Sequence, residues 1–169
     1  MLCNILSHFV TKPTSAHQQA TFKILQYIKG SPGAEIFLSA DSNIHMKGFN
    51  DSNWAGCIDT RRSIIGYAIY LDNSLISWKS KKHVTVSRNS LEVKYKALPS
   101  ATYANPVFHE RTKHFEIDCH LVREKMQKGI VKLLPVTSTN QLANIYTKAS
   151  LLGAFQFMYS KLGMSNIHS

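Results

Sequence analysis

The alternation of apolar and polar positions divides the chain into helical and strand-like segments. Between residues 20 and 28 the apolar side chains recur at helical spacing. Ser15, with Gln18 three residues later, has the capping-box pattern that begins a helix. Gly30 suits the left-handed position that follows a helix. We therefore predict a helix over 15–30.

After Ala34 the period shortens to two, which is typical of half-buried strands. The expected strands are residues 35–39, 44–49, 65–71 and 75–79. Asp72, Asn73 and Ser74 have turn chemistry, so the last two strands form a hairpin in which Trp78 is expected in the core. The second strand leads into Asp51, whose carboxylate is expected in a turn at the strand's tip, where sheet proteins often place chemistry.

The second half of the chain is mainly helical in pattern. Asn89 and Glu92 resemble another capped helix start, and Pro99 is expected to end or kink that helix at a cost of ~3 kcal/mol. Two further helices are expected to end at Gly129 and Gly163, with a short one over 142–149. The β-rich run 130–136 is interpreted as a buried strand. This order favours an α/β fold, a sheet covered by helices.

The charge balance points to a polyanionic partner. Twenty Lys and Arg oppose ten Asp and Glu, for a net charge of +10, and the pI is near 9.6. Nucleic acid phosphates are the simplest partner for such a surplus. The densest basic clusters are Arg61, Arg62, Lys79, Lys81 and Lys82, with Arg111 and Lys113 further along. An ordinary exposed sheet edge, where lysine blocks unwanted pairing, is the alternative interpretation of the hairpin cluster.

Other patterns narrow the class of protein. Three widely spaced cysteines give no disulfide framework and favour a reducing, intracellular setting. The apolar start has neither the basic leader of a signal peptide nor the length of a membrane span. His109 and His114 are five residues apart, so on a helix they point ~140° away from each other and do not fit the zinc-protease motif. No serine has a nucleophile signature. From spacing alone, Asp51 with Glu92 is only a weak metal-site pattern.

Several long motifs, taken together, resemble one known family. They are residues 25–30 (LQYIKG), 50–57 (NDSNWAGC), 60–63 (TRRS), 66–67 (GY), 75–82 (LISWKSKK), 105–114 (NPVFHERTKH) and 141–148 (QLANIYTK). In this order they are similar to the ribonuclease H domain of plant copia-type LTR retrotransposon Pol polyproteins. The resemblance covers nearly the whole chain. By it, residues 1–33 are a connecting helix from the reverse transcriptase side and 34–169 the ribonuclease H-like domain.

The family implies a mixed sheet flanked by helices and cleavage of the RNA strand of RNA–DNA hybrids. The chemistry it implies uses two Mg²⁺ ions held by four acidic residues. This sequence keeps the first acid as Asp51, whereas a neighbouring acid of the family is Asn53 here. The fourth acid, in a Gln-Leu-Ala-Asp motif, is Asn144.

The second and third acids also depart from the family. The helix motif Glu-x-Glu-Tyr corresponds to Glu92-Val93-Lys94-Tyr95, so alignment on its second Glu places Lys94 in the catalytic position. Alignment on its first Glu keeps Glu92 instead, and both alignments stay open. The segment with the third acid, together with a central strand, is expected to be deleted near 102–104.

We therefore expect a degenerate ribonuclease H-like domain, impaired or inactive, that retains binding to RNA–DNA hybrids or other nucleic acids. One alternative is an active ribonuclease H that uses Asp51 and Glu92; another is a host-recruited protein-interaction module. Loss of a central strand predicts that 130–136 pairs directly with the Asp51 strand. Lys94 is expected to form a salt bridge with Asp51.

Overall fold

The computed structural model describes residues 6–30, 32–41, 44–102, 115–150 and 152–166, and within them the fold is α/β. A three-stranded antiparallel sheet has the order β2 (Met46–Asn53), β3 (Ile64–Leu71), β4 (Ser74–Lys82). A second, two-stranded sheet pairs β1 (Ala34–Ile36) with β5 (Met164–Asn166). The helical segments are η1 (Ser7–Phe9), α2 (Ser15–Gly30), α3 (Ser90–Thr102), α4 (Phe115–Gln127), α5 (Asn144–Thr147) and α6 (Leu152–Lys161).

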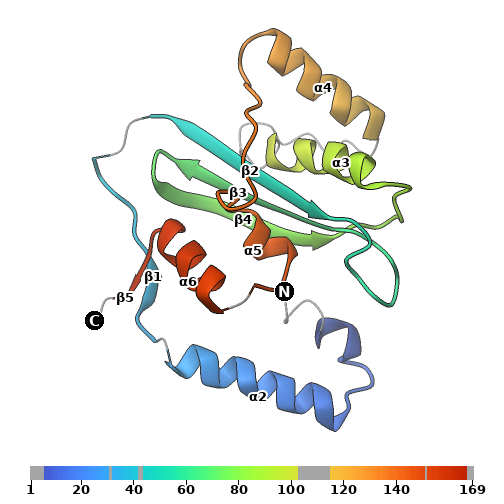
Figure 1. The fold of residues 1–169 in the computed structure, drawn as a ribbon, viewed down its shortest axis with the longest axis vertical. Helices are drawn as coiled ribbons and strands as arrows, with labels where there is room; N and C mark the ends of the chain where they lie inside the picture. The colour runs from blue at the N-terminus through green and yellow to red at the C-terminus, as the bar shows by residue number, and fades with distance from the viewer. Residues whose placement is uncertain (1–5, 31, 42–43, 103–114, 151, 167–169) are drawn as a thin grey trace.

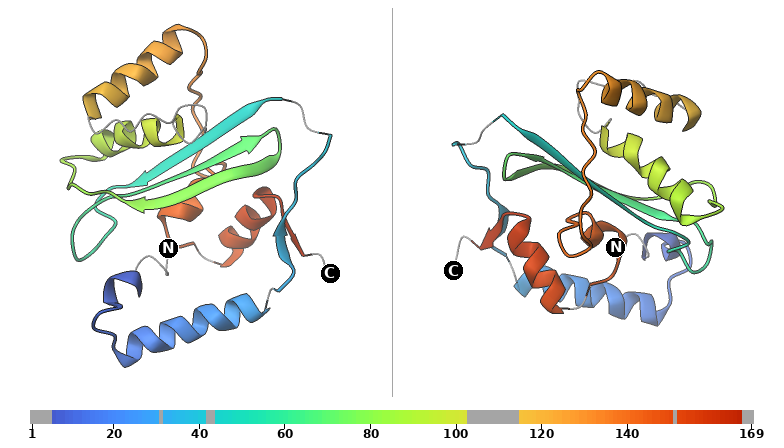
Figure 2. Two further views of the ribbon diagram at one scale, coloured as in Figure 1. Left: turned by 180° about the vertical axis from the view of Figure 1, so that it is seen from behind. Right: turned by 45° about the horizontal axis from the view of Figure 1, so that its top comes forward.

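Helices cover both faces of the larger sheet. In Figure 1, α3 lies along the sheet with α4 outside it, while α5 and α6 lie toward the other face. The view from behind in Figure 2 agrees, and it places α2 apart from the sheet. The main core lies between the sheet and the two C-terminal helices, and its buried members are Ala68, Tyr70, Leu75, Leu142, Met158 and Leu162. The central strand β3 carries apolar residues toward both layers, which accounts for its nearly unbroken burial.

The predicted α/β, ribonuclease H-like class with a reduced sheet agrees with this arrangement. The hairpin β3–β4 and the helix ends at Gly129 and Gly163 are confirmed, and both glycines have positive φ, 70° and 69°. Every strand pair in the described ranges is antiparallel. Among the described residues β2 pairs with β3 alone, so it forms one edge of its sheet.

Several local predictions are corrected. β2 continues through Asn53, so Asp51 lies within a paired strand rather than in a turn. Thr14, not Ser15, precedes α2, and its hydroxyl and backbone N–H contact His17 Nδ1. Gly30 is the last residue of α2, and its φ is not positive. The short helix α5 covers only Asn144–Thr147.

Two further corrections concern proline and exposure. Of the two outcomes expected at Pro99, an early helix end is wrong, because α3 runs past it to Thr102, and Pro99 is buried. Trp78, on the edge strand β4, is 50% exposed rather than buried in the core.

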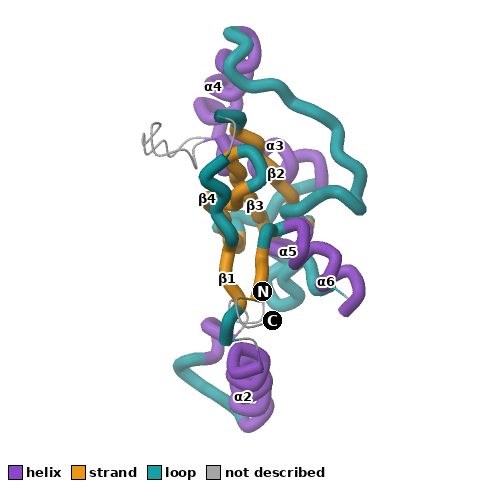
Figure 3. The backbone as a smooth tube through the Cα atoms, turned by 90° about the vertical axis from the view of Figure 1, so that its left-hand side faces the viewer, coloured by secondary structure: helices purple, strands orange, loops and turns teal. Residues whose placement is uncertain are grey.

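The run 130–136 is not a strand. Figure 3 shows the whole connection between α4 and α5 as loop. Residues 130–133 lie beside β2, where they line a hollow with Met46, Gly48 and Asn50, but they pair with no strand of the described ranges. Leu134 is 67% exposed. β-rich composition alone does not make a strand, since the backbone must also find a hydrogen-bonding partner.

Candidate functional site

Asp51 lies on the edge strand β2 and faces α5. Its register partner is Gly66, and a Cβ at that glycine would lie 2.7 Å from Tyr146 Cβ and 3.0 Å from Thr147 Cγ2. The missing side chain thus lets α5 approach the sheet closely. Thr147 donates its hydroxyl hydrogen to Asp51 Oδ2. The Asn53 side-chain amide donates to the Thr147 carbonyl at 3.3 Å and so also contacts α5.

Lys148, directly after α5, supplies the cation beside Asp51. Its Nζ lies 3.3 Å from Asp51 Oδ2 and 3.2 Å from Asn144 Oδ1. The Asp51 side chain is 13% exposed and that of Lys148 is 48% exposed, so the ammonium covers the carboxylate on its solvent side. The predicted ion pair with Lys94 is wrong: Asp51 pairs with Lys148 instead.

Lys94 nevertheless lies in the same hollow as Asp51. Leu91, Lys94, Tyr95 and Leu98 share one face of α3, at the spacing i, i+3, i+4, i+7. This face lines a hollow of about 470 Å³ at the open edge of β2, together with Asp51, Asn144 and Lys148. The structure therefore brings together three of the predicted site residues, Asp51, Lys94 and Asn144, from three separate elements.

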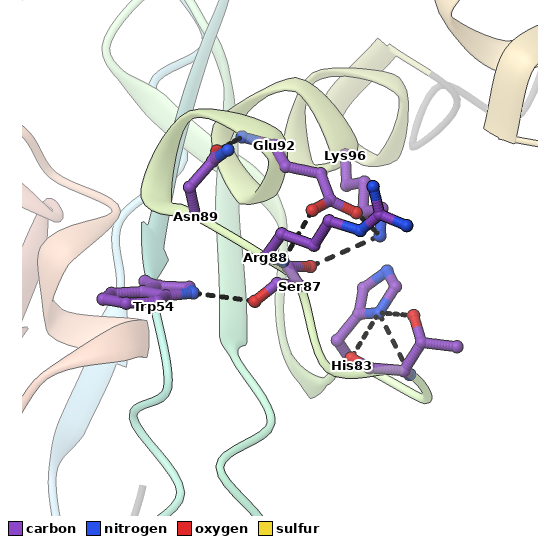
Figure 4. Close-up of polar contacts among 8 residues, drawn as sticks. Trp54, His83, Ser87, Arg88, Asn89, Glu92 and Lys96 are labelled. Carbon is purple, nitrogen blue, oxygen red and sulfur yellow. Dashed lines mark hydrogen bonds and ion pairs between the residues drawn. The ribbon is translucent and has the colours of Figure 1, made fainter.

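Glu92 lies elsewhere and has a different role (Figure 4). Its backbone N–H donates to Asn89 Oδ1 at 2.8 Å. Its Oε2 accepts from the Arg88 backbone N–H at 2.7 Å, and its Oε1 pairs with Lys96. Two hydrogen bonds hold the pKa of the Glu92 carboxyl below its usual range: the larger effect comes from the Lys96 ammonium and the smaller from the Arg88 backbone N–H. Glu92 is thus a helix-capping residue, as its capping-box spacing predicts, and it does not line the Asp51 hollow.

Substitution Glu92→Gln tests this capping role. We expect lower stability at neutral pH, because the variant loses the charged hydrogen bonds to Lys96 and Arg88. Since folding lowers this pKa, the carboxylate's contribution exists above the unfolded-state pKa and is lost as pH falls through the folded-state pKa. Urea unfolding of both proteins from neutral to acidic pH should show the difference shrinking. An equal difference at all pH values would contradict the role.

The sequence did not single out a polar network at the start of α3, also drawn in Figure 4. Trp54 Nε1 donates to the Ser87 carbonyl at 2.9 Å, and Lys96 Nζ donates to Ser87 Oγ at 3.3 Å. Ser87 is 2% exposed. These bonds join the loop after β2 to the start of α3 and so fix the helix that presents Lys94.

The basic hairpin residues gather at one end of the sheet. Lys82 pairs in register with Ile64, and Ile64 follows Arg62 by two residues. The basic cluster at 61–62 therefore lies beside the one at 79–82. Arg61, Lys79 and Lys81 are exposed, and Arg62 and Lys82 are half-buried. We call these five residues the hairpin basic patch. Arg111 and Lys113 lie outside the described residues.

The side chains present do not fit a two-ion magnesium site. In the described ranges, no three His, Cys, Asp or Glu side chains are grouped closely enough to hold a metal ion. The hollow offers one carboxylate, already bonded to Thr147 and Lys148, and the Asn144 amide oxygen, also bonded to Lys148. Magnesium requires hard oxygen ligands in near-octahedral geometry, and ammonium groups repel it.

In the part of the chain that the structure describes, no helix combines the length and apolar composition needed to cross a bilayer.

The chain is similar to Pol polyproteins of plant transposons. It is 34% and 32% identical to the retrovirus-related Pol polyproteins from transposons RE1 and RE2 of Arabidopsis thaliana, over 97% of its length. It is 26% identical to the one from transposon TNT 1-94 of Nicotiana tabacum, over 95%. The chain spans only 13%, 14% and 14% of these proteins. No family model and no solved structure matches it.

Proposed function

We propose that this chain is a ribonuclease H-like domain that binds nucleic acid and has little or no ability to cleave it. The chain belongs to the copia-type retrovirus-related Pol polyproteins of plant retrotransposons. The observation that carries the proposal is the composition of the hollow beside Asp51. Its charged side chains are one carboxylate and two lysines, Lys94 and Lys148.

Two-ion hydrolysis of a phosphodiester needs several carboxylates converging on ions ~3.5–4 Å apart. Here the carboxylate that could begin such a site is bonded to an ammonium group 3.3 Å away. A divalent ion would have to displace Lys148 and also approach Lys94, so the electrostatic balance is against binding.

Glu92 does not supply the missing acid, since it caps α3 and pairs with Lys96. The length of the alignment with a relative also supports a deleted segment in this chain. The alignment with the RE1 polyprotein extends over 197 residues, whereas this chain has 169. The relative therefore carries residues without a counterpart here, in keeping with a deletion near 102–104. β2, as an edge strand, is open on the side toward 130–133.

The basic character of the chain supports binding to nucleic acid. The net charge is +10, and the hairpin basic patch concentrates part of it on one end of the sheet. Contacts of lysine and arginine with phosphates are independent of sequence and weaken as salt rises. We therefore propose salt-sensitive binding to an RNA–DNA hybrid, without base readout.

Titration of a fluorescent RNA–DNA hybrid at several salt concentrations tests this function. The double substitution Lys81→Glu and Lys82→Glu should lower the affinity about tenfold or more and reduce the dependence of log K on log salt by about two, one per phosphate contact. The matched control is Lys23→Glu with Lys29→Glu, which changes the charge equally on the exposed helix α2.

Equal effects in the two double variants would contradict binding through the hairpin basic patch. If instead the chain binds a protein partner with no dependence on Lys81 and Lys82, the protein-interaction module is the better account.

A further inference from the structure

The hollow beside Asp51 presents positive charge to solvent although it contains the carboxylate. Lys94 is exposed, and the Lys148 side chain is 48% exposed, whereas that of Asp51 is 13% exposed. A molecule that enters the hollow therefore meets two ammonium groups before it meets the acid. With Lys94, Lys148 and Asp51 ionised, the group carries a net charge of +1.

Lys148 is held in a fixed position. Its Nζ contacts Asp51 Oδ2 at 3.3 Å and Asn144 Oδ1 at 3.2 Å. An ammonium group has three N–H donors, so one remains beyond these two contacts. Because the lysine is already ordered, a ligand that accepts this hydrogen bond pays less conformational entropy than it would with a mobile side chain. The Lys148 ammonium is thus held between the carboxylate oxygen of Asp51 and the amide oxygen of Asn144.

We propose that this hollow is a phosphate-binding site, in which Lys94 and Lys148 receive one phosphodiester of a nucleic acid strand. The inference rests on the proposed nucleic-acid binding and places a strand at the former catalytic position. There the family would hold divalent ions, whereas this chain holds the phosphate with its own ammonium groups. The substrate class is retained, and the hydrolytic step is not.

A strand fits the hollow better than a free phosphate ion. Exposed ion pairs are weak individually, so two partly solvated lysines hold a lone phosphate poorly. A polymer carries neighbouring phosphates that reach other lysines, and each contact raises the effective concentration for the next. The hollow is also at the open edge of β2, where a strand can enter and leave.

Four single variants and a labelled RNA–DNA hybrid test the proposal by fluorescence anisotropy. Lys94→Glu should weaken binding about tenfold and lower the salt slope by about one. Lys23→Glu, an equal charge change on α2, should change the affinity about twofold or less. Asp51→Asn should strengthen binding several-fold, because it removes a negative charge beside the phosphate while Asn144 still holds Lys148 in place.

The outcomes separate this site from the proposed function. If Lys94→Glu behaves as Lys23→Glu while Lys81→Glu with Lys82→Glu weakens binding, the site is overturned and the function stands. If neither substitution weakens binding, both fall. Thermal unfolding verifies that each variant is folded, and Lys94→Gln, which keeps size without charge, should lie between native and Lys94→Glu. Inorganic phosphate at matched ionic strength should displace the hybrid poorly; complete displacement at low millimolar phosphate would overturn the assignment to a strand.

Discussion

A variant that combines Lys94→Glu, Asn144→Asp and Lys148→Gln is expected to bind Mn²⁺ and Mg²⁺ beside Asp51, whereas the native chain is not. The native hollow has one carboxylate and two ammonium groups. The variant would place three carboxylates there and remove both cations. Hard divalent ions prefer such oxygen ligands, and at an effective dielectric near 20 each close charge contributes about 4 kcal/mol at ~4 Å.

Thermal unfolding with and without Mn²⁺ measures this gain, since an ion that binds the folded state raises the midpoint. Calorimetric titration should give at least about tenfold tighter binding than for the native chain. The matched control is Lys23→Glu with Lys29→Glu, which changes the net charge by the same four units away from the site. If the triple variant and the control bind Mn²⁺ equally, the three positions do not converge around Asp51.

Substitution Gly66→Ala is expected to destabilise the fold by about 1–3 kcal/mol, the range for overpacking a filled interior. Its Cβ would lie 2.7 Å from Tyr146 Cβ, so α5 must move away from the sheet. The same movement would separate Lys148 from Asp51. Chemical denaturation measures the loss of stability.

Gly48→Ala is the control for this substitution, because that glycine also lies in the sheet and its Cβ would meet Ile69 Cδ1 at an ordinary 3.4 Å. Alanine in a strand also costs less conformational entropy than glycine. We therefore expect Gly48→Ala to be neutral or slightly stabilising. Equal losses of stability in the two variants would show that the close approach of α5 is not the reason why Gly66 does not tolerate alanine.

Local pattern predicted those elements whose partners are close in sequence. The β3–β4 hairpin and the Asn89 cap of α3 follow from turn and capping chemistry, which act over a few residues. Prediction failed where a distant partner decides the outcome. In the described part of the chain the run 130–136 has strand composition but pairs with no strand, and Trp78 is 50% exposed on the edge strand β4.

The candidate site shows the same division. The residues at Asp51, Lys94 and Asn144 could be identified from motifs, and the structure places them around one hollow. The ion pair between Asp51 and Lys148 could not, because it depends on how closely α5 approaches Gly66. One signal was available: Lys148 follows Asn144 by four residues, the spacing at which helical side chains meet.

The decisive experiment compares the rate of RNA cleavage in a labelled RNA–DNA hybrid with Mg²⁺ between the native chain and Asp51→Asn. We expect the hybrid to stay equally intact with both proteins, because Lys148 and Lys94 hold the place of the ions. Clear cleavage by the native chain that Asp51→Asn abolishes would contradict it.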